Sequence, residues 1–228
     1  MDNVGEIPVV PHDAVSDVKD ALVSSRPRLP KRIFDIAMSL VGIIVLAPLL
    51  LVTAVLVALL DGRPVLFLQE RVGIDGKPFT LFKFRSMRAS NEDSPQITAD
   101  GDQRITKIGH WLRKLKLDEL PQLFNVLIGE MSFVGPRPEV AKYVDLYDQD
   151  QRRVLQLMPG ITDPASLKYF DESERLAAAD DAHEMYVKTI MPDKISINLQ
   201  YGAKASLLSD AGVILKTVRR VFVSESES

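Results

Sequence analysis

The chain has 228 residues and a net charge of −3 at neutral pH, from 28 Lys and Arg against 31 Asp and Glu. This length accommodates one domain with a sizeable core, or one domain with a membrane anchor. The acidic balance argues against a nucleic-acid-binding protein, whose contact surface is usually basic. Because cysteine is absent and the three histidines are scattered, disulfides and thiol nucleophiles are excluded and zinc chemistry is disfavoured.

The two ends of the chain have the composition of tails. Residues 1–30 contain four prolines and several acidic side chains, which predicts a mobile tail with at most a short helix at 14–24. Residues 223–228 are rich in Ser and Glu and are predicted to be disordered. We find no internal repeat, so residues 31–222 are expected to form a single membrane-associated domain.

A membrane segment is predicted at residues 33–60, because residues 36–60 contain no charged side chain. A straight helix of that run would be about 37 Å long, against a hydrocarbon core of about 30 Å. Pro48 interrupts its hydrogen bonding, and basic residues flank both ends, which favours keeping both ends on the cytoplasmic side. A kinked, re-entrant helix explains both the proline and the flanking charges. Composition alone favours a plain membrane span equally. A buried helix of a soluble core is the weaker alternative, because such helices are rarely apolar on all sides.

A β-hairpin is predicted next. Residues 65–68 and 78–85 have strand character and flank residues 73–77, which have turn chemistry. Because side chains alternate along a strand, Lys83 and Arg85 are expected on one face, where two cations could hold a phosphate. A solvated strand face is the alternative.

After a polar loop at 89–103, two consecutive helices are predicted. Residues 105–115 combine apolar residues at helical spacing with basic residues and a tryptophan, which is typical of a helix at a membrane interface. A surface helix packed on the core is the alternative. Residues 120–128 form the second helix. Residues 131–138 are expected to be a rigid turn that presents Arg137 as a phosphate clamp or as a structural arginine.

The remaining chain is predicted to be mainly helical. We expect a helix at 139–157, an irregular segment at 161–170, and helices at 172–190 and 194–206 separated by Pro192. A last helix, capped by Ser209 and Asp210, is a further candidate for lipid contact. The fold class is therefore α+β and mostly helical, with a re-entrant membrane helix, a β-hairpin and interfacial amphipathic helices around a cytosolic catalytic site.

Asp118 and Glu119 are the candidate catalytic pair. They lie just before a helix that starts with Pro121, where the helix dipole favours ionised carboxylates and bound phosphate. By spacing alone, an N-cap role for Asp118 is the favoured interpretation. Phosphate chemistry gains weight from the surrounding cations, because they could neutralise a phosphoryl target. Aspartate also forms phosphoryl-enzyme intermediates, and adjacent carboxylates can ligate Mg²⁺ together with substrate phosphates. The candidate cations are Lys83, Arg85, Arg113 and Arg137.

Several ordered motifs resemble the bacterial sugar transferases, the monotopic polyprenol-phosphate phosphoglycosyl transferases. They are KRIFD at 31–35, QERVG at 69–73, FKFRSM at 82–87, LDELPQ at 117–122, FVGPRP at 133–138 and PGIT at 159–162. The apolar segment with its central proline fits as well. The resemblance covers about residues 31–222 and implies the small, catalytic-domain-only form of the family.

The resemblance implies transfer of a sugar-1-phosphate from a UDP-sugar to undecaprenyl phosphate, which starts glycan assembly (exopolysaccharide, capsule, O-antigen or glycoprotein). Asp118 would be the nucleophile, Glu119 its acid/base or metal partner, and both would ligate Mg²⁺. Arg113 would bind phosphate, and Arg71, Lys83, Arg85 and Arg137 are the other candidate phosphate ligands.

The resemblance also implies a bacterial inner-membrane protein with its catalytic domain on the cytoplasmic face, and a membrane helix that breaks at Pro48. The expected partners are membrane lipids and downstream glycosyltransferases, and no nucleic acid. Residues 163–169 depart from the usual family pattern, which leaves the donor sugar open. Two other functions stay open: a membrane-anchored scaffold without catalysis, and a glycosyltransferase that releases UDP.

Overall fold

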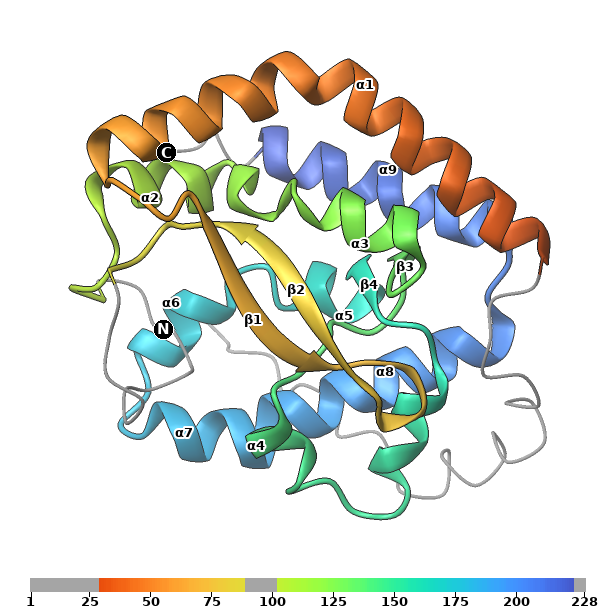
Figure 1. The fold of residues 1–228 in the computed structure, drawn as a ribbon. Helices are drawn as coiled ribbons and strands as arrows, with labels where there is room; N and C mark the ends of the chain where they lie inside the picture. The colour runs from red at the N-terminus through yellow and green to blue at the C-terminus, as the bar shows by residue number, and fades with distance from the viewer. Residues whose placement is uncertain (1–28, 89–101, 224–228) are drawn as a thin grey trace.

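The computed structural model describes residues 29–88 and 102–223 (Figure 1). The possible helix at 14–24, nearly all of the polar loop at 89–103, most of the N-terminal tail and the tail from 224 lie outside the described residues. A long helix, α1, arches over one side of a mainly helical body that contains a β-hairpin (Figure 1). The α+β, mostly helical class is confirmed.

The predicted helix at 33–60 is confirmed as α1, Leu29–Leu60, and it continues through Pro48, so the predicted break at this residue is wrong. It is bent along its length (Figure 1), as expected of a helix with an internal proline. The burial of its side chains is the reverse of that in a soluble helix. Asp35, Ser39 and Thr53 are buried against the body, while most of its large apolar side chains are exposed. Within the described residues, it is the one helix long and apolar enough to cross a membrane. This surface is that of a membrane-associated helix and not of a soluble core.

Both halves of α1 pack on the same body. Near its start, Arg32 donates to Val126 O and Leu127 O at 2.6 and 2.8 Å, at the C-terminal end of α3. Asp35 Oδ1 accepts from Ser132 Oγ and Phe133 N. Near its end, Val57 packs with the side chains of Phe84 and Leu112. The helix therefore lies along one side of the domain.

The predicted hairpin is confirmed, and its first strand is longer than expected. β1, Leu66–Val72, pairs antiparallel with β2, Pro78–Phe84, across a 3₁₀ turn at Ile74–Gly76. Asn125, which is fully buried, fixes the hairpin to α3: its Oδ1 accepts from Phe82 N at 3.0 Å and its Nδ2 donates to Thr80 O at 2.7 Å.

The two helices around the carboxylate pair are also confirmed. α2 spans Lys107–Lys114, and the Thr106 side chain caps it by accepting from Gly109 N at 2.9 Å. A 3₁₀ turn, Leu117–Glu119, leads to α3, Gln122–Ile128, which ends at Gly129 with φ of 97°. A side chain is strained at that φ, so glycine suits this helix end.

The structure corrects two predictions about residues 131–138 and 161–170. β3, Ser132–Val134, and β4, Gly160–Thr162, form a parallel pair, so the first region is not a turn throughout. A Cβ on Gly135 would lie 2.0 Å from Met158 O, so glycine permits this close approach. The second region is not irregular, because Asp163 Oδ1 accepts from Ser166 N at 2.9 Å and caps α5, Pro164–Lys168.

The single helix predicted at 139–157 is wrong. The region contains α4, Ala141–Val144, and a 3₁₀ helix, Gln151–Gln156. Asp148 and Gln151 form a local turn between them, since each side chain accepts from the other's backbone N–H, at 3.1 and 2.8 Å. Such side-chain bonds compete with helix continuation.

The predicted break at Pro192 is also wrong. After α6, Glu172–Ala177, the chain runs through α7, Ala182–Met185, a π-helical turn, Tyr186–Ile190, and α8, Met191–Lys204. Pro192 lies in the first turn of α8, where its missing N–H is tolerated. The break falls earlier, where Asp181 caps α7. The largest apolar cluster of the core lies among α4, α6, the π-helical turn and α8.

The last helix, α9, spans Leu207–Val223 and is confirmed, although it starts before the predicted cap. Ser206 Oγ accepts from Ser209 N at 3.2 Å. Asp210 is instead buried and accepts from Lys31 Nζ of α1 at 2.5 Å. This ion pair connects the first and last described helices.

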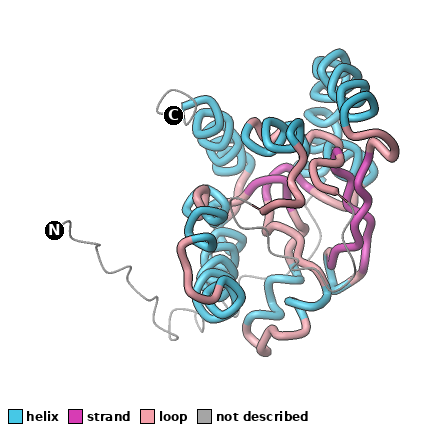
Figure 2. Tube along the Cα trace, turned by 90° about the vertical axis from the view of Figure 1, so that its left-hand side faces the viewer, coloured by secondary structure: helices cyan, strands magenta, loops and turns pink. Residues whose placement is uncertain are grey.

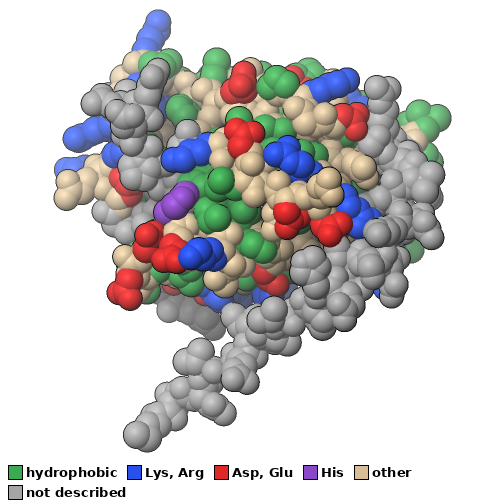
Figure 3. Space-filling view, turned by 90° about the horizontal axis from the view of Figure 1, so that it is seen from below, with side chains coloured by type: hydrophobic (Ala, Val, Ile, Leu, Met, Phe, Trp, Pro, Cys, Tyr) green, Lys and Arg blue, Asp and Glu red, His purple; other side chains and the backbone are tan. Residues whose placement is uncertain are grey.

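The surface is asymmetric. α1, α9 and the α2–α3 segment lie along one side of the molecule in two perpendicular views (Figures 1 and 2). Exposed apolar side chains include Leu208 and Leu215 of α9 and Trp111 of α2, which is 59% exposed. The opposite face shows acidic and basic side chains interspersed (Figure 3). The α1 side is therefore the one suited to lipid.

Candidate active site

Asp118 occupies the 3₁₀ turn between α2 and α3 and is 5% exposed. The N-cap residue of α3 is Pro121, so the N-cap interpretation of Asp118 is wrong. Its Oδ1 atom is buried and has no hydrogen-bond partner among the described residues. An unpaired buried carboxylate oxygen is costly, and such atoms often mark a functional site.

Glu119, the next residue, is fully engaged. Its Oε1 accepts from Lys83 Nζ at 3.2 Å, and Arg137 forms a bidentate pair through Nη1 to Oε2 at 3.2 Å and through Nη2 to Oε1. Lys83 comes from β2 and Arg137 from the loop after β3. The fold thus brings Lys83, Glu119 and Arg137 together from three separate elements, beside Asp118.

The pKa values of the two carboxyl groups shift in opposite directions. Burial, and then the neighbouring Glu119, raise the pKa of Asp118. Burial also raises the pKa of Glu119, but Arg137 and Lys83 outweigh it and hold that pKa well below its usual range. These shifts have local causes: burial acts on both carboxyls, and the lowering by Arg137 and Lys83 dominates only at Glu119. Asp118 is the more basic of the two carboxylates.

A small inner pocket adjoins Glu119. It is lined by Arg71, Leu81, Lys83, Gln122, Arg137 and Pro138. The Arg71 guanidinium is buried and oriented by Pro138 O at 3.0 Å and by Gln69 Oε1 at 2.7 and 3.1 Å. Burial lowers the pKa of Lys83 to about 8, against the opposing effect of Glu119. Among these lining residues are three cations and no carboxylate, which favours an anion.

The other two candidate cations lie elsewhere. Arg113 donates to Met87 Sδ at 3.7 Å, and its charge lowers the pKa of Asp118, so it stands on the Asp118 side of the pair. Arg85 is committed to the end of α1, because its Nη2 donates to Asp61 O and to Gly62 O, the latter at 2.5 Å. The structure therefore separates Arg85 from Lys83: Lys83 lies in β2, and Arg85 follows the end of that strand.

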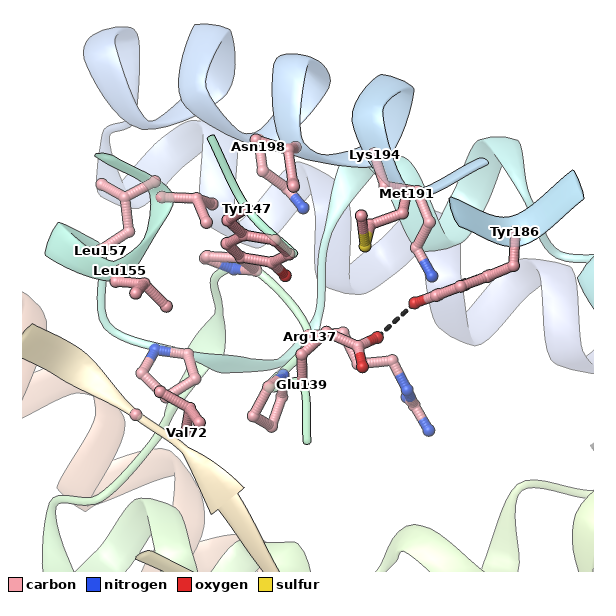
Figure 4. Close-up of a pocket in the computed structure, with 16 residues that line it drawn as sticks. Val72, Arg137, Glu139, Tyr147, Leu155, Leu157, Tyr186, Met191, Lys194 and Asn198 are labelled. Atoms are coloured by element: carbon pink, nitrogen blue, oxygen red, sulfur yellow. Dashed lines mark hydrogen bonds between the residues drawn. The ribbon is translucent and has the colours of Figure 1, made fainter. Parts of the chain in front are cut away.

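The loop that presents Arg137 is fixed at its exit. Val72 N donates to Glu139 O at 2.8 Å, and the Tyr186 hydroxyl donates to Glu139 Oε1 across a larger pocket (Figure 4). Burial, together with Glu139, raises the pKa of Tyr186 well above its usual range, so the phenol stays a donor. Arg137 and Pro138 line both pockets, so this loop lies between them.

Two residues that the sequence reasoning missed support the site. Gln122, in the first turn of α3, is 2% exposed and its Nε2 has no partner among the described residues. Lys116, at φ of 55°, begins the turn and lowers the pKa of both carboxyls. The available signal for Gln122 was a polar residue four positions after Asp118, at the start of an otherwise largely apolar helix.

The donor set fits Mg²⁺ only in part. Within the part of the chain that the structure describes, no group of three or more His, Cys, Asp or Glu converges. Both oxygens of Glu119 are occupied by cations, whereas Asp118 Oδ1 is available. Since Mg²⁺ often takes one carboxylate with substrate phosphates and water, Asp118 fits as a single protein ligand and Glu119 does not in this arrangement.

Comparison with known proteins gives consistent matches. The bacterial sugar transferase model matches residues 26–224. The uncharacterized sugar transferase EpsL of Bacillus subtilis is 37% identical over 195 residues, which cover 86% of this chain and 88% of EpsL.

Two longer relatives have named activities. The UDP-N-acetylgalactosamine-undecaprenyl-phosphate N-acetylgalactosaminephosphotransferase of Aeromonas hydrophila is 38% identical, over 84% of this chain and 43% of its own length. The UDP-glucose:undecaprenyl-phosphate glucose-1-phosphate transferase of Escherichia coli is 33% identical, over 99% of this chain and 46% of its own length. The chain thus spans less than half the length of these two relatives.

The family match confirms the resemblance carried by the motifs, and it includes α1, the carboxylate pair and the loop of Arg137. The similarity to EpsL extends over most of both chains. Because the family model matches nearly the whole described chain and these relatives are 33–38% identical to it, the chain belongs to the bacterial sugar transferase family.

Proposed function

We propose that the protein transfers a sugar-1-phosphate from a UDP-sugar to undecaprenyl phosphate and so starts glycan assembly. The observation that carries the proposal is Asp118: a buried carboxylate with one unpartnered oxygen, beside a pocket lined by three cations. The names of the Aeromonas and Escherichia relatives, which contain both a UDP-sugar and undecaprenyl phosphate, support the substrate classes.

The reaction proceeds in two displacements at one phosphorus. An Asp118 carboxylate oxygen attacks the phosphorus that bears the sugar, a new oxygen–phosphorus bond forms, and the bond to the bridging oxygen breaks, so that UMP leaves with that oxygen. A phosphate oxygen of undecaprenyl phosphate then attacks the same phosphorus. The acyl-phosphate bond breaks, Asp118 regains its carboxylate, and the polyprenyl diphosphate sugar is formed.

The neighbouring residues have distinct roles in this proposal. The raised pKa makes Asp118 a more basic and hence stronger nucleophile once ionised. Lys83, Arg137 and Arg113 stabilise charge on the phosphates. Glu119, with its low pKa, is a poor proton donor and instead positions Lys83 and Arg137. Mg²⁺, held by Asp118, would neutralise phosphate charge when bound.

The proposal places α1 in the bacterial inner membrane, with the catalytic domain on the cytoplasmic face. Two observations support a re-entrant helix over a span: both halves of α1 pack on one body, and Pro48 lies inside it.

The chain has no native cysteine, so single cysteines at Val4 and at Asp75 in the hairpin turn can be labelled without background. The re-entrant helix gives labelling of both from one side of the membrane; labelling from opposite sides contradicts it.

The activity is tested by measuring nucleotide release from a panel of UDP-sugars with undecaprenyl phosphate and Mg²⁺. The parent protein is expected to release UMP, and Asp118→Asn to lower the rate by roughly 10⁴-fold or more, as expected for loss of a nucleophile. Asp145→Asn, at an exposed site, is the matched control. Release of UDP would indicate a glycosyltransferase, and release of neither nucleotide a scaffold. An Asp118→Asn protein as fast as the parent would remove Asp118 as the nucleophile.

A further inference from the structure

Gln122 has a buried side-chain amide with an unused donor. The residue is 2% exposed, and Nε2 has no hydrogen-bond partner among the described residues. A buried unpaired donor destabilises the fold unless something satisfies it. Asn125, one turn further along α3, uses its buried amide fully, with bonds to Phe82 N, Thr80 O and Glu130 Oε2. Gln122 is thus an exception within its own helix.

The Gln122 side chain lines the inner pocket together with Arg71, Lys83 and Arg137. The three cations already have partners: Glu119 for Lys83 and Arg137, and Gln69 and Pro138 O for Arg71. Each of the three cations thus has at least one partner, whereas Nε2 of Gln122 has none among the described residues. An anion that enters the pocket would meet this unpaired N–H donor next to three positively charged side chains.

Gln122 follows Asp118 by four residues, through Leu120 and Pro121 in helical conformation. Side chains four apart on a helical segment share a face. Each carries a buried atom without a partner, Oδ1 on Asp118 and Nε2 on Gln122, and the two are not bonded to each other. A phosphoryl group between them would use both atoms: the Asp118 carboxylate oxygen attacks its phosphorus, and one of its outer oxygens accepts the Gln122 N–H.

We propose that Gln122 is a substrate-binding residue, whose Nε2–H donates to a non-bridging oxygen of the sugar-bearing phosphate of the donor in the inner pocket. This inference rests on the proposed function for the identity of the donor. It assigns to Gln122 the alignment of that phosphate with Asp118, in addition to the neutralisation of charge by the cations.

The test substitutes Gln122→Met, which keeps the length of the side chain and removes its polar atoms. Loss of one hydrogen bond to a charged group is expected to lower kcat/KM for the UDP-sugar by roughly 10- to 100-fold. The melting temperature is expected to stay or rise, because an unpaired buried donor is lost. Gln200→Met, the same change on the exposed face of α8, is the matched control and should alter neither quantity.

A binding measurement separates this inference from the proposed function. UDP, which carries the diphosphate common to all these donors, is titrated against Asp118→Asn with and without Gln122→Met, and the second change is expected to weaken binding roughly 10- to 100-fold. If the parent protein releases no UMP but UDP binding depends on Gln122, the function fails and the Gln122 site stands. If UMP is released and Gln122→Met changes neither kcat/KM nor UDP binding, the inference is wrong.

A structural role for Gln122 would give a different pattern, with lower melting temperature, lower activity and unchanged UDP affinity, and this result overturns the proposal. Should Gln122→Met fold poorly, Gln122→Glu keeps the shape of the side chain and puts a carboxylate among the three cations. That variant is expected to fold stably and to bind UDP more weakly than the parent. Unchanged UDP affinity in Gln122→Glu also overturns the proposal.

Discussion

On one side of the carboxylate pair, Glu119 is matched by ion pairs to Lys83 and Arg137. On the other side, Asp118 and Gln122 each bury a polar atom without a partner among the described residues. Both sides are polar and largely removed from solvent: Asp118 and Gln122 are buried, and the Glu119 side chain is 13% exposed. The difference lies in whether the protein satisfies its own groups: the Glu119 side is complete without a ligand, and the Asp118–Gln122 side is not.

This contrast suggests that the two sides have different roles, one in stability and one in substrate binding. A matched cluster holds its members in place and contributes to stability, whereas unmatched atoms lower stability and stay available to a substrate. Substitutions on the two sides are therefore expected to move stability in opposite directions while both lower activity.

Glu119→Gln is expected to lower both stability and activity. The change removes the charge shared by Lys83 and Arg137. Breaking a fully buried ion pair costs about 3–5 kcal/mol, and the loss here is expected to be smaller, because these side chains are partly exposed to solvent. Activity is expected to fall by roughly 10²- to 10³-fold, comparable to the loss of one electrostatic stabiliser. Denaturant unfolding and UMP release measure the two effects.

The pH profile of Glu119→Gln supplies a second readout. Glu119 raises the pKa of Asp118, so its removal is expected to shift the acidic limb of the rate profile to lower pH. A Glu119→Gln protein as stable as the parent would show that the Glu119 side is not the matched cluster described above. Gln122→Met, with its unchanged or raised melting temperature, is the contrasting variant.

Lys83→Arg is expected to change the alkaline limb of the pH profile. The pKa of Lys83 is lowered to about 8, so at pH 9 only about one-tenth of the parent protein keeps this cation. Activity that depends on the cation should fall roughly tenfold between pH 7 and 9 in the parent and stay flat in Lys83→Arg, since Arg remains charged. UMP release across pH 6–9.5 measures this, with Lys83→Met as the variant that is slow at every pH.

Stability distinguishes this titration from alkaline unfolding. The pKa of Lys83 in the folded chain lies below its value of about 10.4 in the unfolded chain, so the unfolded chain binds more protons between these values. The free energy of unfolding from this group therefore rises from about pH 8 to about pH 10. A parent protein that loses activity and stability together above pH 8 would contradict the assignment of the alkaline limb to Lys83.

Local patterns in the sequence predicted most of the elements near the site. The uncharged run of α1, the turn chemistry of the hairpin and the apolar spacing of α2, α3 and α9 are each contained in one stretch of chain. The parallel pair of β3 and β4 was missed, because Ser132 and Gly160 are far apart in sequence and each strand has three residues. Pro192 misled, since the same residue breaks a helix interior and suits its first turn.

The candidate site was predictable as a set of charges but not as an arrangement. Asp118, Glu119, Lys83 and Arg137 stand out in motifs rich in charge and proline. The opposite pKa shifts of Asp118 and Glu119 depend on which cations reach which carboxylate, and these come from β2 and from the loop after β3. Gln122 carries no charge, so its importance emerges only when burial leaves its amide unpaired.

Arg85→Met is expected to have the smallest effect on activity, and it serves as a test at a cation outside the inner pocket. Arg85 and Lys83 lie two residues apart, yet Arg85 donates to the carbonyls of Asp61 and Gly62 at the end of α1. Losing hydrogen bonds from a charged donor is expected to cost about 1.5–3 kcal/mol of stability. The KM for the UDP-sugar should stay within about twofold, because Arg85 does not line the inner pocket. Lys83→Met should instead raise this KM and also lower stability, because Lys83 belongs to the matched Glu119 cluster. A raised KM without a loss of stability in Arg85→Met would assign Arg85 to the phosphate site.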